Sequence, residues 1–347
     1  MHKSMALFLG LLIFSFIVTS VCLVPFINLL YRFRMTRKKQ KTKDFQDKPT
    51  PIFDYLHQHK VGTPVGGGFL VVLIVSLLFA LLFPLGKYLG VFVTHVYPIF
   101  EEINIIFFSF LSFAILGLYD DIMKFFNFST SGFFGLRMRH KFAIQWVLAL
   151  IISLLLYQNL KIDIFYIPFI GVFKLGLLYI PLAAFIIVSF TNAVNITDGL
   201  DGLAAGLLMI CLFALWILSA SILDTPLSFF ISLWIGSLIA FLYFNVYPAR
   251  VWLGDVGSLS FGATLAVVGL LLGKAMGLLV IGGIFILEIV TSLLQILWKK
   301  FKHRKLFAVA PFHLWLQLLG WEEPKVVMRA WLAGIILAVF GVWLAVI

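Results

Sequence analysis

The sequence predicts an all-α protein that crosses a membrane about ten times. Of its 347 residues, 62% are hydrophobic and only 12% are charged, whereas soluble domains carry roughly 25% charged residues. The hydrophobic residues fall into runs close to the roughly 20 residues that a helix needs to span a bilayer. We therefore expect a polytopic membrane protein in which residues 1–347 form a single integral-membrane domain.

The expected spans follow one another along the chain with polar connections between them. The first run is too long for the core of a signal peptide and ends in a basic loop, so we expect it to stay as a helix. Residues 159–175 alternate in polarity and suggest a short outer β-hairpin. The spans are placed, to within several residues, at 5–30, 66–86, 102–118, 142–158, 176–193, 202–222, 227–244, 257–273, 276–298 and 327–346.

The placement of positive charge predicts the orientation of the chain. If the N-terminus lies outside, the inner segments are 31–65, 119–141, 191–206, 245–258 and 298–330, and they hold 21 of the 26 Lys and Arg residues. Positive charge concentrates on the cytoplasmic side of membrane proteins, so both termini are expected outside. The net charge of +11 is then explained by basic loops against anionic lipid headgroups, and nucleic-acid binding has little support.

Five aspartates lie where the expected spans meet the inner loops. Charged groups at membrane depth are costly and usually functional, and carboxylates that converge would repel one another without a cation. Mg²⁺ takes oxygen ligands and shares them with substrate phosphates, so the sequence favours a magnesium site. The alternative is that each aspartate caps a helix end on its own. The five are Asp120, Asp121, Asp198, Asp201 and Asp255.

The first two acids are adjacent in "ILGLYDDIMK". Neighbouring residues on a helix point about 100° apart. Asp120 and Asp121 therefore cannot face the same point, and at most one of them is expected to touch a ligand.

The segment "NAVNITDGLDGLAAG" predicts a polar recognition surface at the start of a helix. Asp198 and Asp201 are three residues apart and are expected to share a helical face, with Asn195 one turn earlier. Gly199 and Gly202 remove side chains beside the acids, which would allow a ligand close to the backbone.

Two other segments carry matching chemistry. In "NVYPARVWLGDVGSLSFG", Trp252 precedes the glycine-flanked Asp255 by three residues and could stack on a base; an interfacial belt tryptophan is an equally good interpretation. The glycine-rich "HQHKVGTPVGGGFL" presents Lys60 and Thr63, and its backbone amides could cradle a phosphate oxygen with the lysine as counter-charge. It is not a P-loop, because the Gly-Lys-Ser/Thr order is absent.

Together these segments resemble the phospho-N-acetylmuramoyl-pentapeptide transferases, within the polyprenyl-phosphate N-acetylhexosamine-1-phosphate transferase superfamily. The resemblance runs nearly end to end and rests on six motifs in the family's order. They are "HQHKVGTPVGGG", "GLYDDIMK", "GLRMRHKFAIQ", "NAVNITDGLDGLAAG", "FNVYPARVWLGDVGSLSFG" and "APFH…GWEEPKVVMRAW".

This resemblance implies ten transmembrane helices in a bacterial inner membrane, both termini outside, and an active site at the cytoplasmic face. It also implies the reaction, in which phospho-N-acetylmuramoyl-pentapeptide moves from its UDP carrier to undecaprenyl phosphate and UMP is released. The product is the first lipid-linked intermediate of peptidoglycan synthesis, and Mg²⁺ is required. The resemblance leaves a homodimer open. The alternative is the sister group, which moves other N-acetylhexosamine phosphates from UDP-sugars to polyprenyl phosphate.

Site residues are carried over by their match to the family's motifs. Asp255 matches the metal-binding aspartate, and Asp120 and Asp121 match the acidic pair, one of which is proposed to engage the lipid phosphate. Trp252 falls where the family usually has phenylalanine against uracil. The nucleotide-facing segment is matched by Asn195, Asp198, Gly199, Leu200 and Asp201. Other polar residues of the same site are matched by Lys60, Thr63, Lys124, Lys141 and Asn245.

The loop "VAPFHLWLQLLGWEEP" is where the chain departs most from the family. The family usually carries consecutive histidines there, but this chain keeps only His313, followed by Leu314 and Trp315. The resemblance implies that His313 contacts substrate, and the alternative is a structural loop histidine. Glu288, a lone acid in the ninth span, is functional by default for its position, although pairing with a hydroxyl of the bundle is a comparable interpretation.

Two other classes of function are compatible with part of this pattern. A transporter would fit ten helices, but the ionisable residues cluster at one membrane face, and neither a midplane site nor an internal repeat is evident. A relative that has kept the fold and lost catalysis is disfavoured by the acids, although the altered histidine loop keeps it open.

Overall fold

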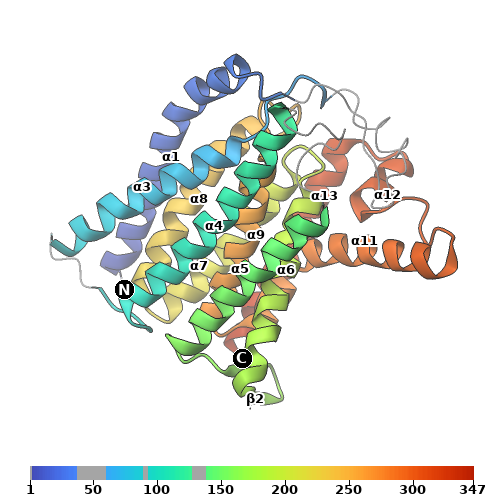
Figure 1. Ribbon diagram of the computed structural model, residues 1–347. Coiled ribbons are helices and arrows are strands. Elements are labelled where there is room, and N and C mark those ends of the chain that lie inside the picture. Colours follow the sequence, from blue (N-terminus) through green and yellow to red (C-terminus); the bar gives the residue numbers. More distant parts are fainter. Residues whose placement is uncertain (1, 37–59, 89–92, 127–137) are drawn as a thin grey trace.

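The computed structural model describes residues 2–36, 60–88, 93–126 and 138–347, and it shows a bundle of long helices (Figure 1). Within these residues, nine helices are long and apolar enough to cross a membrane, and the number is ten if one bent pair counts as a single span. The predicted all-α, polytopic architecture is therefore confirmed.

The first half of the bundle contains α1 (His2–Arg32), α3 (Gly67–Tyr88), α4 (Ile99–Phe126), α5 (Met138–Gln158), β1 (Ile164–Ile167), β2 (Gly171–Lys174), η2 (Gly176–Leu178) and α6 (Tyr179–Thr197). The second half contains α7 (Leu203–Ser221), α8 (Thr225–Asn245), α9 (Gly254–Leu271), α10 (Ala275–Ile281), α11 (Gly283–Lys302), α12 (Phe312–Leu318) and α13 (Glu323–Val346).

The predicted hairpin between the fourth and fifth spans is present. β1 and β2 pair antiparallel, with Phe165 opposite Phe173. The ammonium of Lys274 lies 4.6 Å from the ring centre of Tyr166 on β1, which ties the hairpin to the turn before α10.

Helices α8 and α9 form the centre of the bundle. Their spans are 83% and 94% buried, whereas those of α1 and α13 are only 28% buried and present leucine, valine and phenylalanine outward. Because lipid tails are as apolar as these side chains, this distribution fits a helix bundle in a membrane.

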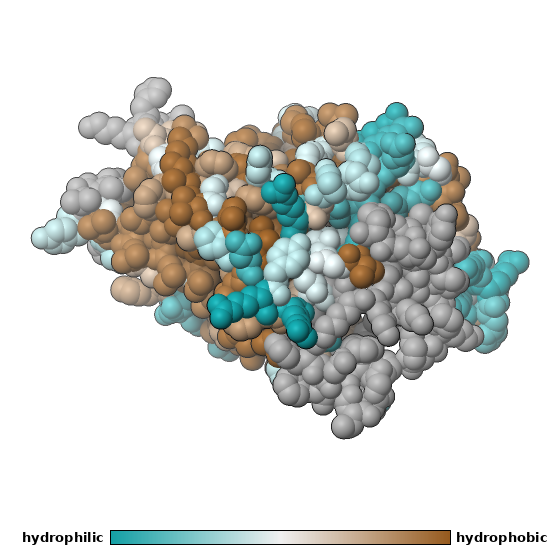
Figure 2. All heavy atoms as spheres, turned by 90° about the horizontal axis from the view of Figure 1, so that it is seen from above, coloured by the Kyte–Doolittle hydropathy of each residue, from teal (hydrophilic) through white to brown (hydrophobic). Residues whose placement is uncertain are grey.

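The helix ends sort the chain into two faces. Figure 1 shows both chain termini at the end of the bundle that carries β2, whereas α4 ends, α5 begins and α9 begins at the opposite end. We call this opposite end the site end. Figure 2 views the molecule from this side, where hydrophilic side chains gather beside a broad apolar margin.

One span is broken. Helix α10 ends at Ile281 and α11 begins at Gly283, with a bend of 79° between them. In Figure 1, α11 runs across the direction of the bundle and the chain returns through α12 to α13. The bend brings the first turns of α11 next to α12, which carries the histidine of the altered loop.

Candidate functional site

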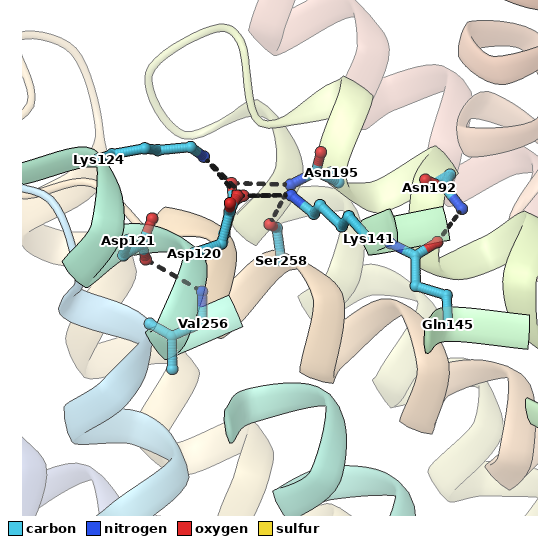
Figure 3. Close-up of polar contacts among 10 residues, drawn as sticks. Asp120, Asp121, Lys124, Lys141, Gln145, Asn192, Asn195, Val256 and Ser258 are labelled. Atoms are coloured by element: carbon cyan, nitrogen blue, oxygen red, sulfur yellow. Dashed lines mark hydrogen bonds and ion pairs between the residues drawn. The ribbon is translucent and has the colours of Figure 1, made fainter. Parts of the chain in front are cut away.

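Two lysines and two aspartates form a compact charge cluster at the site end (Figure 3). The Lys124 ammonium lies 2.9 Å from Oδ2 of Asp120 and 2.7 Å from Oδ2 of Asp255. Lys141 approaches from the other side, 3.0 Å from Oδ2 of Asp120, and also pairs with Asp255. Both lysines are thus shared by both acids, and the four residues carry balanced formal charge.

Three helices place this cluster. Asp120 and Lys124 are one turn apart near the end of α4 and pair along its surface, Lys141 lies in the first turn of α5, and Asp255 lies in the first turn of α9. Gly117 makes the close approach of α4 to α9 possible, because a Cβ there would lie 2.2 Å from the carbonyl oxygen of Asp255.

Asp121 points away from the cluster. Its Oδ2 accepts the backbone N–H of Val256 at 3.2 Å, and Figure 3 shows its side chain turned from the two lysines. It therefore satisfies one of the free amides at the start of α9. The prediction that the two adjacent acids cannot face one point is confirmed, and Asp121 follows the capping alternative.

Asn195 connects the end of α6 to the cluster. Its amide nitrogen donates to Oδ1 of Asp255 at 3.2 Å and to the hydroxyl of Ser258 at 2.7 Å. A carboxylate can only accept, so Asp255 fixes which way the amide lies, and the amide oxygen is turned away from Ser258 (Figure 3). Sequence reasoning missed Ser258, although its position three residues after Asp255 on the same helix was a usable signal.

A second missed contact holds α5 against α6. The amide nitrogen of Asn192 donates to the side-chain oxygen of Gln145 at 2.7 Å, and Gln145 is almost fully buried. Gln145 follows Lys141 by one helical turn (Figure 3). This contact therefore sets the position from which Lys141 reaches the acids.

The expected helical face of Asp198 and Asp201 is absent, so that prediction is wrong. Helix α6 ends at Thr197 and α7 begins only at Leu203, after Gly202 with a φ of +79°. Asp198 and Asp201 thus lie in a turn. Asp201 accepts the backbone N–H of Ala249 at 2.9 Å.

Lys60 is buried and held by several groups of the protein. Its ammonium lies 2.6 Å from Oε1 of Glu323 and 3.1 Å from Oδ1 of Asp201, and it donates to the carbonyl of Gly199 at 3.0 Å. It also lies 4.7 Å from the ring centre of Trp252. Because its partners are carboxylates of the protein, the structure shows an anchor of the turn after α6 rather than a free counter-charge for phosphate.

The backbone amides of the glycine-rich loop are also used within the protein. Those of Gly66 and Gly67 donate to the carbonyl of Trp252 at 3.1 and 2.8 Å, and that of Gly68 donates to Leu253 at 2.9 Å. The predicted phosphate cradle is therefore wrong for these three amides, which instead join α3 to the segment before α9. Thr63 lies outside this contact and is partly exposed.

Asn245 and Trp252 lie on either side of the loop between α8 and α9. Asn245 donates to the carbonyl of Val251 at 2.9 Å and accepts the N–H of Gly202 at 3.2 Å. Trp252 is 7% exposed. Asn245 thus supports the loops of the expected nucleotide segment, whose Leu200 is also buried, and stacking of Trp252 on a base stays a prediction.

His313 is buried at the start of α12 and pairs with Glu288 of α11. Its Nδ1 lies 3.0 Å from Oε2 of Glu288, and its backbone N–H donates to Oε1 at 3.2 Å. The partner of Glu288 is thus an imidazole, whereas the sequence interpretation offered a hydroxyl.

The two residues after His313 face elsewhere. Leu314 is buried, and Trp315 is 37% exposed and packs against Phe307 and Phe312, with ring centres 6.5 and 5.8 Å apart. Trp315 therefore contributes to an aromatic cluster on the α12 surface.

The five aspartates do not converge as predicted. Asp120 and Asp255 meet across the lysines, Asp121 caps α9, and Asp201 pairs with Lys60. Among the residues that the structure describes, no group of three or more His, Cys, Asp or Glu side chains is close enough to hold a metal ion. Mg²⁺ is often bound by one or two carboxylates together with substrate phosphates, and the pair Asp120 and Asp255 fits that smaller requirement.

Comparison with known proteins decides the family. A family model described as glycosyl transferase family 4 matches residues 103–273. A phospho-N-acetylmuramoyl-pentapeptide-transferase of Aquifex aeolicus is 38% identical over 309 residues, covering 82% of this chain and 80% of that protein. The chain belongs to the phospho-N-acetylmuramoyl-pentapeptide-transferase family.

Other members of the family match over similar or greater lengths. The phospho-N-acetylmuramoyl-pentapeptide-transferase of Chloroflexus aurantiacus is 37% identical over 313 residues, 84% of this chain and 79% of that protein. That of Thermodesulfovibrio yellowstonii is 34% identical over an alignment of 360 positions, 98% of this chain and 91% of that protein.

Membership of the phospho-N-acetylmuramoyl-pentapeptide-transferase family confirms the resemblance seen in the six motifs. The chain is a multi-pass bacterial membrane protein of a transferase family that serves peptidoglycan synthesis and cell-wall biogenesis. The membership replaces the transporter interpretation. It also gives the charge cluster a chemical context, because a transferase of phosphorylated sugars has to hold phosphate groups.

Proposed function

We propose that this chain transfers phospho-N-acetylmuramoyl-pentapeptide from its UDP carrier to undecaprenyl phosphate and releases UMP. The observation that carries the proposal is the charge cluster, in which Lys124 and Lys141 are each shared by Asp120 and Asp255. Phosphoryl transfer needs mainly positioning and charge neutralisation, and ammonium groups held next to a metal-binding carboxylate supply both.

In the proposed reaction, an oxygen of the lipid phosphate attacks the β-phosphorus of the donor. One P–O bond forms to that oxygen, and the bond from the β-phosphorus to the bridging oxygen breaks, so UMP leaves with the electron pair. Lys124 and Lys141 would exchange part of their carboxylate contacts for contacts with phosphate oxygens. Lys124 is partly exposed, which leaves its ammonium room to turn toward a ligand.

Asp255 is the proposed Mg²⁺ ligand, with Asp120 next to it. When bound, the ion would offset the charge that develops on the leaving UMP. The chain's contribution is to hold the Asp255 carboxylate in place, since Asn195 donates to one of its oxygens and the lysines pair with the other.

We propose that Asp120 orients the acceptor and does not act as a general base. The second pKa of a phosphomonoester is about 6, so the nucleophile is mostly ionised at neutral pH. Asp120 is also held by two ammonium groups, which fix the position of its carboxylate. Asp120→Asn should lower turnover equally from pH 6 to pH 8; near-full activity at pH 8 with loss below pH 6 would instead support a base.

The proposed location is the bacterial inner membrane, with the site end at the cytoplasmic face and both termini outside. Two observations support it: the predicted inner segments hold 21 of 26 Lys and Arg residues, and Figure 1 places both termini at the end away from the cluster. Homodimer formation stays a prediction, to be checked by the mass of the purified protein in detergent.

The test is UMP release by the purified protein from UDP-N-acetylmuramoyl-pentapeptide and undecaprenyl phosphate, with and without Mg²⁺. Lys141→Met and Asp255→Asn should abolish release while leaving thermal melting near that of the wild type. Absence of release by the wild type, with nucleotide binding intact, would reject the enzyme. Competition with UDP-N-acetylglucosamine distinguishes the sister group, since a sister-group enzyme would turn over that donor in preference.

A further inference from the structure

The contact of Glu288 with His313 is arranged to orient a ring. Both residues are 2% exposed. One carboxylate receives two donors from the same residue: the backbone N–H at 3.2 Å and Nδ1 at 3.0 Å. Holding both the backbone and the ring of His313 leaves the imidazole little freedom to turn.

The Glu288 carboxylate also selects the ring nitrogen of the imidazole that carries a proton. Because a carboxylate only accepts hydrogen bonds, Nδ1 has to carry the proton. Nε2 on the opposite side of the ring is buried and has no hydrogen-bond partner among the residues that the structure describes. Buried ring nitrogens of histidine are normally satisfied, so this atom calls for an explanation.

Nε2 of His313 faces the turn that follows α6. A Cβ added to Gly199 would lie 2.7 Å from Nε2. The imidazole can therefore occupy this position only because residue 199 has no side chain. The neighbouring Asn195 donates to Asp255. The unsatisfied nitrogen therefore points at the turn that joins the expected nucleotide segment to the charge cluster.

We propose that Glu288 is a positioning residue for the transfer reaction, acting through His313. It holds the imidazole with Nδ1 protonated and keeps Nε2 directed at the Asp198–Gly199 turn, where a small shift of the turn on donor binding brings Nε2 within hydrogen-bond reach of the donor. This inference rests on the proposed function. The competing explanation is a tie between α11 and α12 that matters for stability alone.

Glu288→Gln separates the two explanations. The glutamine keeps the volume of the side chain but offers one acceptor to two donors, so its NH₂ group has to face either the backbone N–H or Nδ1. When it faces Nδ1, the ring proton moves to Nε2 and the tautomer is reversed. We expect kcat for UMP release to fall about 10- to 100-fold, by analogy with the loss seen when the hydrogen-bonded partner of a metal-ligating histidine is removed. KM should change less.

The double variant tests whether Glu288 acts through the histidine. If it does, Glu288→Ala combined with His313→Ala should lose no more kcat than His313→Ala alone, because the interaction is already gone. Glu102→Gln is the matched control, a buried glutamate of α4 outside the site, and it should keep wild-type kcat. Wild-type kcat in Glu288→Gln, or losses that multiply in the double variant, would overturn the proposal.

A measurement that needs no turnover keeps the inference separate from the proposed reaction. The ring ¹⁵N signals of His313, assigned among the seven histidines by their loss in His313→Ala, should show the Nδ1-protonated tautomer in the wild type and a change in Glu288→Gln. No UMP release from the wild type would reject the proposed function. A tautomer that stays unchanged in both Glu288→Gln and Glu288→Ala, which removes both acceptor oxygens, would reject the positioning role whatever the activity.

Discussion

Gly117 offers the most direct test of how the helices place the charge cluster. A methyl group in Gly117→Ala would lie 2.2 Å from the carbonyl oxygen of Asp255 and 2.5 Å from the backbone nitrogen of Val256. These atoms belong to the first turn of α9 and cannot turn aside as a flexible side chain would. Ordinary contact begins at 3.4 Å, so α4 has to move from α9 by about 1.2 Å, the difference between 3.4 and 2.2 Å.

This displacement acts on stability and on catalysis. Overpacking of this kind costs about 1–3 kcal/mol, which should lower the melting temperature of the purified protein. Asp120 lies one turn after Gly117 and shares its lysines with Asp255, so the same movement separates the two acids. A misplacement of about 1 Å can cost roughly 100-fold in rate, and we expect kcat for UMP release to fall by that order.

The control is another helical glycine, Gly10 of α1, which has nothing within 4 Å of an added Cβ. Alanine is favoured over glycine in a helix by about 1 kcal/mol, so Gly10→Ala should keep kcat and melt at the same or a slightly higher temperature. The two substitutions are chemically identical and are expected to act in opposite directions. A Gly117→Ala protein with wild-type kcat and melting temperature would refute the packing argument.

Three other predictions concern buried charges. Lys60→Met leaves two buried carboxylates without their cation, and breaking a buried pair costs about 3–5 kcal/mol. The melting temperature in detergent should therefore drop sharply. A raised KM for the donor with an unchanged melting temperature would instead indicate a phosphate contact. The buried carboxyl groups of Glu102 and Asp224 interact electrostatically, and burial, the largest cause, raises the pKa of Asp224 above its usual 3.8. An acid whose pKa is raised by folding stabilises the protein below its unfolded pKa and loses that contribution as pH rises through the folded pKa. The melting temperature should therefore fall as pH rises above about 4. Glu102→Gln should make this fall smaller. Asp121→Asn can still accept the α9 amide and should keep more activity than Asp120→Asn; equal losses in UMP release would contradict the division of roles.

The transmembrane helices could be predicted from the sequence because the bilayer fixes their length. A run of about 20 apolar residues has one stable form in a hydrocarbon layer, where every backbone amide has to be bonded internally. The break at Gly282 was not predictable by the same argument, since hydropathy continues through it and the bend depends on how α10 and α11 pack against α13 and α6.

The spacing of residues along the sequence predicted the directions of their side chains correctly only where one helix runs through all of them. The divergence of Asp120 and Asp121 was correct because α4 runs through both residues. The shared face of Asp198 and Asp201 was wrong because α6 stops between Asn195 and these acids. Gly202, which was interpreted as room for a ligand, takes a φ of +79° directly before α7, and the sequence alone does not separate these two uses of glycine.

Contacts between distant segments were beyond reach of motif reasoning. Lys60 and Glu323 are 263 positions apart and bond at 2.6 Å. A lysine in a glycine-rich loop has the same appearance in a sequence whether its partner is a phosphate or a buried glutamate. The three-dimensional contacts decide between them, and here they assign Lys60 to the support of the turn after α6.

The charge of the cluster explains why a divalent cation belongs in the proposed reaction. Lys124 and Lys141 balance Asp120 and Asp255, so the four residues bring no surplus positive charge to the site. A donor diphosphate and an acceptor phosphate add several negative charges in surroundings where isolated charges are costly. The lysines can turn to these phosphates only if another cation takes over the carboxylates, and Asp255 would hold Mg²⁺ for this purpose in the proposed reaction. Without the ion, the donor should therefore bind more weakly when the acceptor is already bound than when it is absent, and the same should hold for the acceptor.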